Sequence, residues 1–318
     1  MPDVTGSAGD ATERTAPDEP ALDRLSSEAL VARIAAGQRR AVEAVERAGP
    51  ALARAVDAAA ERLADPTGDP AAGRGRLAML GAGASGRIAV QDGAELWPTF
   101  GWPAERLLLA IAGGRTALVD SVEGAEDDAG AGAAEAAAAG ICSDDVVVAV
   151  AASGRSPWTV AWARAARERG ALTVGLAGNA GTPLLEAVEC PVLLDAGPEV
   201  LAGSTRLGAG TAQKAALNAF GTALMVRLNR TWGNLMVDMA ARNAKLDARR
   251  VAMLRQVVPG LPEDRAAEAL AAAGGSVKLA ALVALGETPD GARARLARHA
   301  GSLRLALVSS TGEGAPGG

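Results

Sequence analysis

The chain has 318 residues, of which 49% are hydrophobic and 22% charged, as expected for a globular protein with a full core. Its formal net charge of −5 gives no overall attraction to nucleic acid or to an anionic membrane surface. A single histidine and two distant cysteines argue against a zinc site, and there is neither a signal peptide nor an apolar run that could span a bilayer. We therefore expect a cytoplasmic protein with no nucleic-acid or membrane partner.

The N-terminal part of the sequence predicts a polar lead-in followed by two helices. Residues 1–20 are rich in Asp, Glu, Gly, Thr and Pro and are expected to be disordered. Apolar side chains then recur at helical spacing from Leu22 to Ile34 and again from Val42 to Leu63, which predicts two helices within residues 21–65.

From residue 66 to about residue 255, short apolar runs alternate with helical segments. Such alternation predicts βαβ units, and hence an α/β fold with a doubly wound parallel sheet covered on both faces. A long apolar helix near residues 206–228 is expected to close the sheet. Cys142 and Cys190 adjoin predicted strands and are expected to be buried structural thiols. The five predicted strands are Leu77–Leu80, Leu107–Ile111, Val146–Val150, Thr173–Leu176 and Pro191–Leu194.

The C-terminal part predicts a small helical domain over residues 256–308. A Pro-Gly-Leu-Pro sequence at residues 259–262 marks the boundary. Beyond it, three short helices are expected at about residues 263–273, 277–285 and 290–299. The tail over residues 309–318 is rich in glycine and is expected to be flexible.

A glycine-rich loop follows the first predicted strand and matches the GxGxxG fingerprint over Gly81–Gly86. A dinucleotide site also needs an acidic residue at the end of the second strand to bind the ribose hydroxyls. The second strand ends instead in Gly113-Gly114-Arg115. NAD is therefore disfavoured as a ligand.

The tetrapeptide Ala-Ser-Gly-Arg occurs twice, at residues 84–87 and 152–155, after the first and third strands. Loops at the carboxyl ends of parallel strands surround the ligand crevice, and their N–H groups and serine hydroxyls suit one small phosphate. Ser204 and Thr205, before the long helix, add donors. The alternative is that each loop is only a tight turn in which glycine supplies positive φ. The repeat favours phosphate binding.

Two glutamates follow these loops in the sequence. Glu95 comes at the end of the helix that starts at the first loop, and Glu126 follows the second strand. Two carboxylates on neighbouring crevice loops can share general acid and base roles. Most glutamates in loops are solvated surface groups, however, and the neighbouring Asp127 and Asp128 are expected to be surface groups or helix caps.

Several motifs in a fixed order carry a resemblance to a known family. They are Leu80–Arg87 leading to Glu95, Ala112–Leu118 with Val122–Asp127, Ala151–Pro157, Gly197–Lys214, Gly233–Asp238 and Asn243–Leu246. Together they resemble the signatures of N-acetylmuramic acid 6-phosphate etherases over about residues 20–255.

The resemblance implies a sugar isomerase (SIS) fold, which usually dimerises to complete its sites. It also implies cleavage of the D-lactyl ether of N-acetylmuramic acid 6-phosphate, by elimination and water addition, without metal or cofactor. The products are N-acetylglucosamine 6-phosphate and D-lactate, as in the recycling of cell-wall amino sugars.

The resemblance also assigns roles to residues. Glu95 matches the acid that protonates the departing ether oxygen, and Glu126 matches the second catalytic glutamate, which removes the proton at C2. Glu199, in a motif shared with other SIS proteins, is a further site candidate. The residues implied to bind the phosphate are Ser85, Gly86, Ser153, Gly154, Ser204 and Thr205.

This chain departs from the family pattern at three places. Ala84 stands where the family has threonine, which removes one hydroxyl near the phosphate. Leu96-Trp97 replaces Cys-Pro beside Glu95, and Gly208 replaces a lysine. One interpretation of these changes is drift that the family's activity tolerates, and the other is a shifted substrate.

Two other functions fit the same fold. A sugar-phosphate sensor would keep the serine loops without needing the glutamates, whereas both glutamates are present here. An aldose–ketose isomerase would also begin by removing the C2 proton, and only the etherase-like motifs argue against it.

Overall fold

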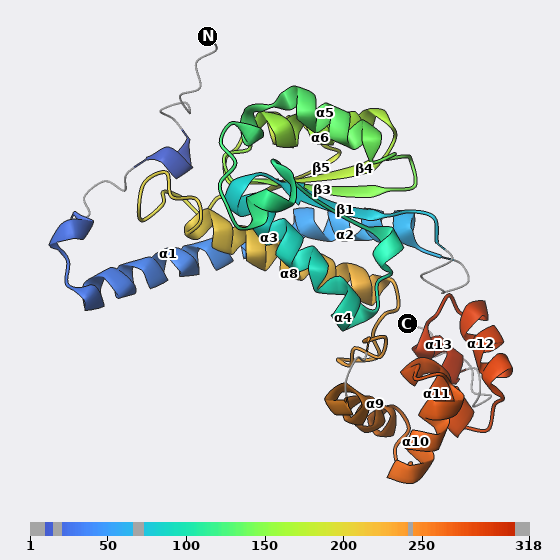
Figure 1. The fold of residues 1–318 in the computed structure, drawn as a ribbon. Helices are drawn as coiled ribbons and strands as arrows, with labels where there is room; N and C mark the ends of the chain where they lie inside the picture. Colours follow the sequence, from blue (N-terminus) through green and yellow to red (C-terminus); the bar gives the residue numbers. More distant parts are fainter. Residues whose placement is uncertain (1–9, 15–20, 66–72, 241–243, 309–318) are drawn as a thin grey trace. The chain divides into compact units, whose positions relative to one another are not determined.

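We describe a computed structural model of the chain, which defines residues 10–14, 21–65, 73–240 and 244–308 (Figure 1). By its internal contacts the chain divides into two compact units. Unit 1 contains residues 1–62, 75–94 and 107–222, and unit 2 contains residues 63–74, 95–106 and 223–318. Most of the predicted N-terminal disordered stretch and the predicted C-terminal tail lie outside the described residues.

Unit 1 is built on a five-stranded parallel sheet with the strand order β2-β1-β3-β4-β5. All five predicted strands are confirmed, and each bound lies within one residue of its predicted position. The apolar runs are continuous rather than alternating because both faces of a parallel sheet are covered. The strands are β1 (Leu77–Gly81), β2 (Leu107–Ile111), β3 (Val146–Ala151), β4 (Leu172–Ala177) and β5 (Cys190–Leu193).

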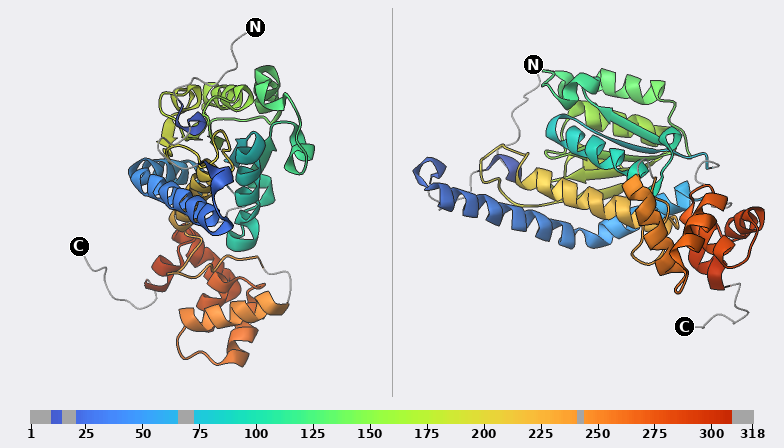
Figure 2. Two further views of the ribbon diagram at one scale, coloured as in Figure 1. Left: turned by 90° about the vertical axis from the view of Figure 1, so that its left-hand side faces the viewer. Right: turned by 60° about the horizontal axis from the view of Figure 1, so that its bottom comes forward.

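Helices cover both faces of this sheet, which confirms the doubly wound fold (Figures 1 and 2). On one face, Trp158 and Trp162 of α6 pack with Leu80 and Val147 in a buried cluster. Both tryptophans are therefore core side chains, at 0% and 1% exposure. This face carries α5 (Ala129–Ala138), α6 (Pro157–Glu168) and α7 (Pro183–Ala187), and the other carries α2, α3 (Gly83–Ala94) and α8 (Gly208–Arg227).

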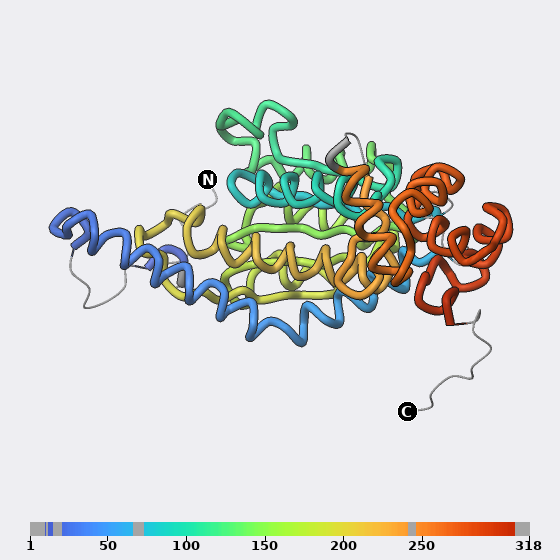
Figure 3. The backbone as a smooth tube through the Cα atoms, turned by 90° about the horizontal axis from the view of Figure 1, so that it is seen from below, coloured from blue at the N-terminus to red at the C-terminus, as the bar shows by residue number. Residues whose placement is uncertain are grey.

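The two predicted N-terminal helices exist, but the break between them was misplaced. Helix α1 spans Ser27–Arg47 and α2 spans Gly49–Leu63, so Val42 and Val45 belong to the first helix. The chain changes direction just before Pro50, because proline lacks an N–H group and is tolerated only in the first turn of a helix. Figure 3 shows α1 beside the start of α8, where Thr211 and Gln38 are joined by a side-chain hydrogen bond.

A buried carboxylate joins the starts of β1 and β3. The Asp145 oxygens accept hydrogen bonds from Arg76 N at 2.8 Å, from Arg76 Nη2 at 2.8 Å and from Cys142 N at 3.1 Å. The Asp145 side chain is 1% exposed. Burial alone would raise the pKa of Asp145, but the hydrogen bonds from Arg76 and Cys142 outweigh it and lower the pKa.

We expect Asp145→Asn to lower the free energy of unfolding by about 3 kcal/mol at pH 7, because it leaves the Arg76 charge without its partner. As the pH falls, Asp145 is protonated in the unfolded state before it is protonated in the folded state, because its pKa is lower in the folded state. The stabilisation is therefore present above about pH 4 and is lost as the pH falls through the folded-state pKa. Urea unfolding at pH 7 and near pH 3 measures both effects. The exposed Asp144→Asn is the control, and an equal difference at both pH values would contradict the prediction.

The prediction of two buried cysteines is wrong for Cys142. That residue lies in the turn before β3 and is exposed, since its N–H group rather than its thiol faces Asp145. Cys190 is half-buried because it begins β5, an edge strand. Burial is the main cause that raises the pKa of the Cys190 thiol.

Unit 2 is helical. The three predicted C-terminal helices are present as α10 (Glu263–Ala272), α11 (Val277–Ala284) and α12 (Pro289–Arg298). The sequence did not predict α4 (Leu96–Phe100), α9 (Ala244–Val257) or α13 (Leu303–Val308). Met253 and Leu254 of α9 share one hydrophobic cluster with Leu270 and Leu296, so the boundary expected near residue 255 falls inside a helix of this unit.

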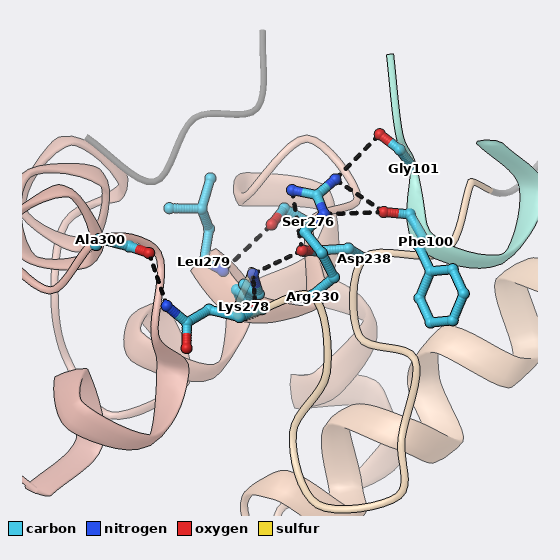
Figure 4. A network of polar contacts seen from close by, with 9 residues as sticks. Phe100, Gly101, Arg230, Asp238, Ser276, Lys278, Leu279 and Ala300 are labelled. Carbon is cyan, nitrogen blue, oxygen red and sulfur yellow. Dashed lines mark hydrogen bonds and ion pairs between the residues drawn. The ribbon is translucent and has the colours of Figure 1, made fainter. Parts of the chain in front are cut away.

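A charged network lies inside unit 2 (Figure 4). Lys278 Nζ lies 2.6 Å from Asp238 Oδ2 and donates a hydrogen bond to the Asn229 carbonyl. Arg230 Nη1 lies 3.2 Å from the same carboxylate oxygen, and the guanidinium also donates to the carbonyls of Phe100 and Gly101. The network thus ties the segment before α9 to α11 and to the end of α4.

In the parts of the chain that the structure describes, no single helix is both long and apolar enough to cross a bilayer. Helices α10 and α11 taken together reach that length and composition, and they are bent by 117°.

Candidate functional site

The GxGxxG loop after β1 holds α3 close to the sheet. A Cβ atom on Gly81 would lie 2.5 Å from the Val150 carbonyl oxygen, and one on Gly86 would lie 2.6 Å from the Gly81 carbonyl oxygen. No other residue fits at either position without a shift of the backbone. Both glycines therefore have a packing role, which accounts for the fingerprint without a dinucleotide.

Ser85 joins the two copies of the repeated tetrapeptide. It lies in the first turn of α3 and is buried. Its Oγ accepts a hydrogen bond of 3.3 Å from the Ala152 N–H group, in the loop after β3. The structure thus brings together the two loops that the sequence paired by their identical residues, while the hydroxyl hydrogen of Ser85 remains able to donate.

The loop after β3 is held from two sides. Ser153 is half-buried, and its Oγ accepts a hydrogen bond of 3.2 Å from the Arg155 N–H group. Asn179, which follows β4, directs its Nδ2 to the Ser153 carbonyl at 3.4 Å. The Gly154 N–H group bonds back to the Ala151 carbonyl, so the loop is a tight turn at the end of the strand.

The loop after β5 leads into α8. Ser204 and Thr205 are half-buried there. The buried carboxylate of Glu199 accepts hydrogen bonds from the N–H groups of Gly208 and Ala209, both at 2.8 Å. These bonds satisfy two of the free donors at the start of the helix, and the charge complements its dipole. Both oxygens of Glu199 are thus engaged with the chain's own backbone.

The two arginines of the repeat have different partners. Arg87 donates to the carbonyls of Ala117 and Asp120, at 2.9 and 3.0 Å, and so supports the loop after β2. Arg155 forms a two-pronged ion pair with Asp10, with its Nε 2.8 Å from Oδ2. The hydrogen bond with Asp10 is the main cause that raises the pKa of Arg155.

An open pocket of about 460 Å³ lies between the loops after β1 and β2. Gly83, Ala84, Arg87 and Glu126 are among its lining residues. The Glu126 carboxylate lies against Gly83, where a Cβ would be 4.0 Å from Oε2. Ser156 donates to the Glu126 carbonyl at 3.3 Å, which ties this glutamate to the loop after β3. The departure at Ala84 therefore lies in the pocket, next to Glu126.

Glu95 is not beside Ser85. It follows the last residue of α3, is exposed, and precedes α4. Glu95 comes ten residues after Ser85 and directly follows the helix, so at ~1.5 Å per residue about 15 Å of chain along the axis of α3 separates the two. Of the neighbouring departures, Leu96 is buried and Trp97 is half-buried.

Some buried polar residues make contacts distant in the chain and were not predicted from the sequence. Asp92 of α3 is 5% exposed and accepts hydrogen bonds of 2.6 Å from both Lys214 and Asn218 of α8. The sequence offered one signal for Asp92, which is that an aspartate stands inside a predicted helical segment among apolar residues. No comparable signal marked Asp10 and Thr12, because they lie in a stretch whose composition is typical of disorder.

Comparisons with known proteins give the following matches. The SIS domain model matches residues 129–223, and the model of the glucokinase regulatory protein N-terminal SIS domain matches residues 57–165. The N-acetylmuramic acid 6-phosphate etherase of Deinococcus radiodurans is 52% identical over 85% of this chain and 85% of its own length. The enzyme of the same name from Rubrobacter xylanophilus is 49% identical over 86% and 88%. A solved phosphoheptose isomerase from Francisella tularensis aligns with 64% of this chain and 100% of its own, with a TM-score of 0.47 and 18% identity.

Proposed function

The chain belongs to the N-acetylmuramic acid 6-phosphate etherase family, and we propose that it is a carbon–oxygen lyase acting on N-acetylmuramic acid 6-phosphate. It cleaves the D-lactyl ether and yields N-acetylglucosamine 6-phosphate and D-lactate. The observation that carries this function is the position of the Glu126 carboxylate, beside Gly83 in the pocket at the carboxyl ends of β1 and β2.

The proposed reaction is an elimination followed by an addition. In the open-chain sugar the aldehyde acidifies the C2 proton, and Glu126 accepts that proton as the base. The C3–O bond then breaks, and Glu95 protonates the departing lactate oxygen. Water adds to C3 of the unsaturated intermediate with the roles of the two carboxylates reversed, so that both return to their initial protonation states.

We propose that the sugar phosphate is bound at the loops after β1, β3 and β5. Ser153 follows the end of β3, and Ser204 and Thr205 lie just before α8; all three are half-buried, so their hydroxyls can donate to phosphate oxygens. Ser85 joins the loops after β1 and β3 through its hydrogen bond with the Ala152 N–H group. Gly86 and Gly154 shape the turns, and Glu199 fixes the start of α8 rather than contacting the substrate. This arrangement suits a cytoplasmic enzyme for soluble sugar phosphates.

We further propose a homodimer in which Glu95 reaches the site of the other copy. The length of α3 between Ser85 and Glu95 supports this arrangement. Glu95→Gln and Glu126→Gln are then each expected to lower lactate release by about a thousandfold when present in both copies. Mixed dimers made by refolding equal amounts of the two variants should regain about a quarter of the wild-type activity, because half of the dimers carry one intact site. No recovery from the mixture would place both glutamates in one copy.

The direct test of function is incubation with N-acetylmuramic acid 6-phosphate in heavy-oxygen water. We expect D-lactate in an amount equal to the sugar product, with the heavy oxygen at C3 of N-acetylglucosamine 6-phosphate. Label only in the lactate would contradict cleavage at C3–O. A ketose product would indicate the isomerase, and binding without any product would indicate the sensor.

A further inference from the structure

A short N-terminal segment lies across the carboxyl ends of three strands. Residues Ala11–Glu13 form a single 3-10 turn, although the composition of residues 1–20 predicts disorder. In Figure 1 this dark blue turn lies beside the loop that follows β5. We call residues 10–13 the strap. It belongs to unit 1, as do all the loops that it contacts.

Each contact of the strap reaches a different loop. Asp10 pairs with Arg155 after β3, with the Nη2 group 3.2 Å from Oδ1. The Thr12 hydroxyl accepts a hydrogen bond of 3.1 Å from Asn179 Nδ2, after β4. The Thr12 carbonyl accepts one of 3.0 Å from the Gly203 N–H group, after β5. Four residues thus contact three loops that lie far apart in the sequence.

The burial of the strap indicates a fixed position. Asp10 is 8% exposed and Thr12 is 3% exposed, while most aspartates and threonines lie at the surface. The buried carboxylate is paired in the two-pronged geometry that makes arginine–carboxylate bonds strong. Glu13 lies at the exposed edge, where a Cβ on Gly203 would be 3.3 Å from its Oε2.

The contacts fall next to the proposed phosphate donors. Ser153 accepts from the Arg155 N–H group, and its carbonyl accepts from the same Asn179 amide that bonds to Thr12. Gly203 directly precedes Ser204 and Thr205. The strap therefore contacts residues next to each of these three hydroxyls. None of the hydrogen bonds and ion pairs described for the strap reaches Glu126 or the loop after β2.

We propose that the strap is a positioning element of the sugar-phosphate site, in which Asp10 holds Arg155, and with it the phosphate-binding loops, in the arrangement that binds the phosphate group. This inference rests on the proposed function. Loosening the strap weakens binding of the phosphate, whereas proton transfer at Glu126 proceeds as before. The strap remains docked, and becomes more ordered, when a sugar phosphate binds.

The test compares full-length wild type with Asp10→Asn, with Thr12→Val and with the charge exchange Asp10→Arg/Arg155→Asp. Asp10→Asn is expected to raise KM about tenfold while kcat changes less than about threefold, since one charge-assisted contact is lost. Thr12→Val keeps the shape of the side chain and should raise KM less. The charge exchange should recover part of the lost affinity. Asp23→Asn, an exposed carboxylate of the same N-terminal region, is the matched control.

Hydrogen exchange of the Gly203 amide reports docking of the strap directly. We expect faster exchange in Asp10→Asn than in wild type, and slower exchange in wild type after addition of N-acetylglucosamine 6-phosphate. Faster exchange on addition of that sugar phosphate would overturn the proposal, because the strap would then compete with the substrate. An unchanged or lowered KM in both Asp10→Asn and Thr12→Val would also overturn it. These exchange measurements remain decisive if wild type releases no lactate, a result that would refute the proposed function alone.

Discussion

Replacing Glu126 by glutamine is expected to lower kcat/KM for lactate release by about a thousandfold, the middle of the range for loss of a general base. The amide keeps the size of the side chain but cannot accept the C2 proton. The carboxylate lies against Gly83 in the open pocket, so the variant should bind N-acetylglucosamine 6-phosphate with nearly unchanged affinity. Lactate release under single-turnover conditions, together with product affinity by calorimetry, measures both effects.

The matched control is Glu123→Gln. Glu123 is exposed and lines the same pocket, three residues earlier in the same loop. Its replacement changes the charge of the pocket equally, so a thousandfold loss confined to Glu126→Gln assigns the proton transfer to that side chain. Equal losses in both variants would indicate that the negative charge of the pocket matters, rather than proton transfer by Glu126. Near-normal turnover of Glu126→Gln would remove Glu126 from the proposed mechanism.

Replacing Asp238 by asparagine is expected to lower the free energy of unfolding of unit 2 by about 4 kcal/mol, because it leaves two buried cations without their carboxylate. The side chains of Arg230 and Lys278 are 7% and 6% exposed (Figure 4). Burial is the main cause that lowers the pKa of Lys278, and the Asp238 charge opposes this shift. Without that charge, Lys278 should lose its proton more readily. Urea unfolding followed by circular dichroism measures the change in stability.

A second variant separates unpaired charge from general disruption. Lys278→Met added to Asp238→Asn removes one of the stranded cations and should recover part of the lost stability. The control Asp247→Asn breaks an exposed ion pair with Arg250, which should cost less than about 0.5 kcal/mol. No recovery in the double variant would show that the unpaired Lys278 charge is not what destabilises Asp238→Asn.

The sheet was predictable from the sequence because its central strands β1, β3 and β4 are buried throughout, so they appear as short and mostly apolar runs. The proximity of the loops after β1 and β3 was also predictable, since the repeated tetrapeptide indicated that these two loops act together. The Ser85–Ala152 hydrogen bond joins these two loops. The break between α1 and α2 was misplaced because alanine suits either face of a helix and blurs the apolar stripe.

The strap and the charged network of unit 2 were not predictable from local patterns. Asp10 and Arg155 are 145 residues apart, and so the pairing depends on the completed fold. Asp238 and Lys278 lie in segments whose composition does not distinguish a buried ion pair from two surface charges. The position of Glu95 was also not predictable from its motif. The motif associates Glu95 with the loops, whereas the length of α3 determines how far along the helix it lies from Ser85.

The glycines at Gly81 and Gly86 also bear on how such sequences are classified. Their spacing reproduces a nucleotide-binding signature because the carbonyls of Val150 and Gly81 leave no room for a side chain at either place. The pattern thus records how closely a helix can approach two adjacent strands, whatever the ligand. A pattern search built on these glycines alone would group this protein with dehydrogenases.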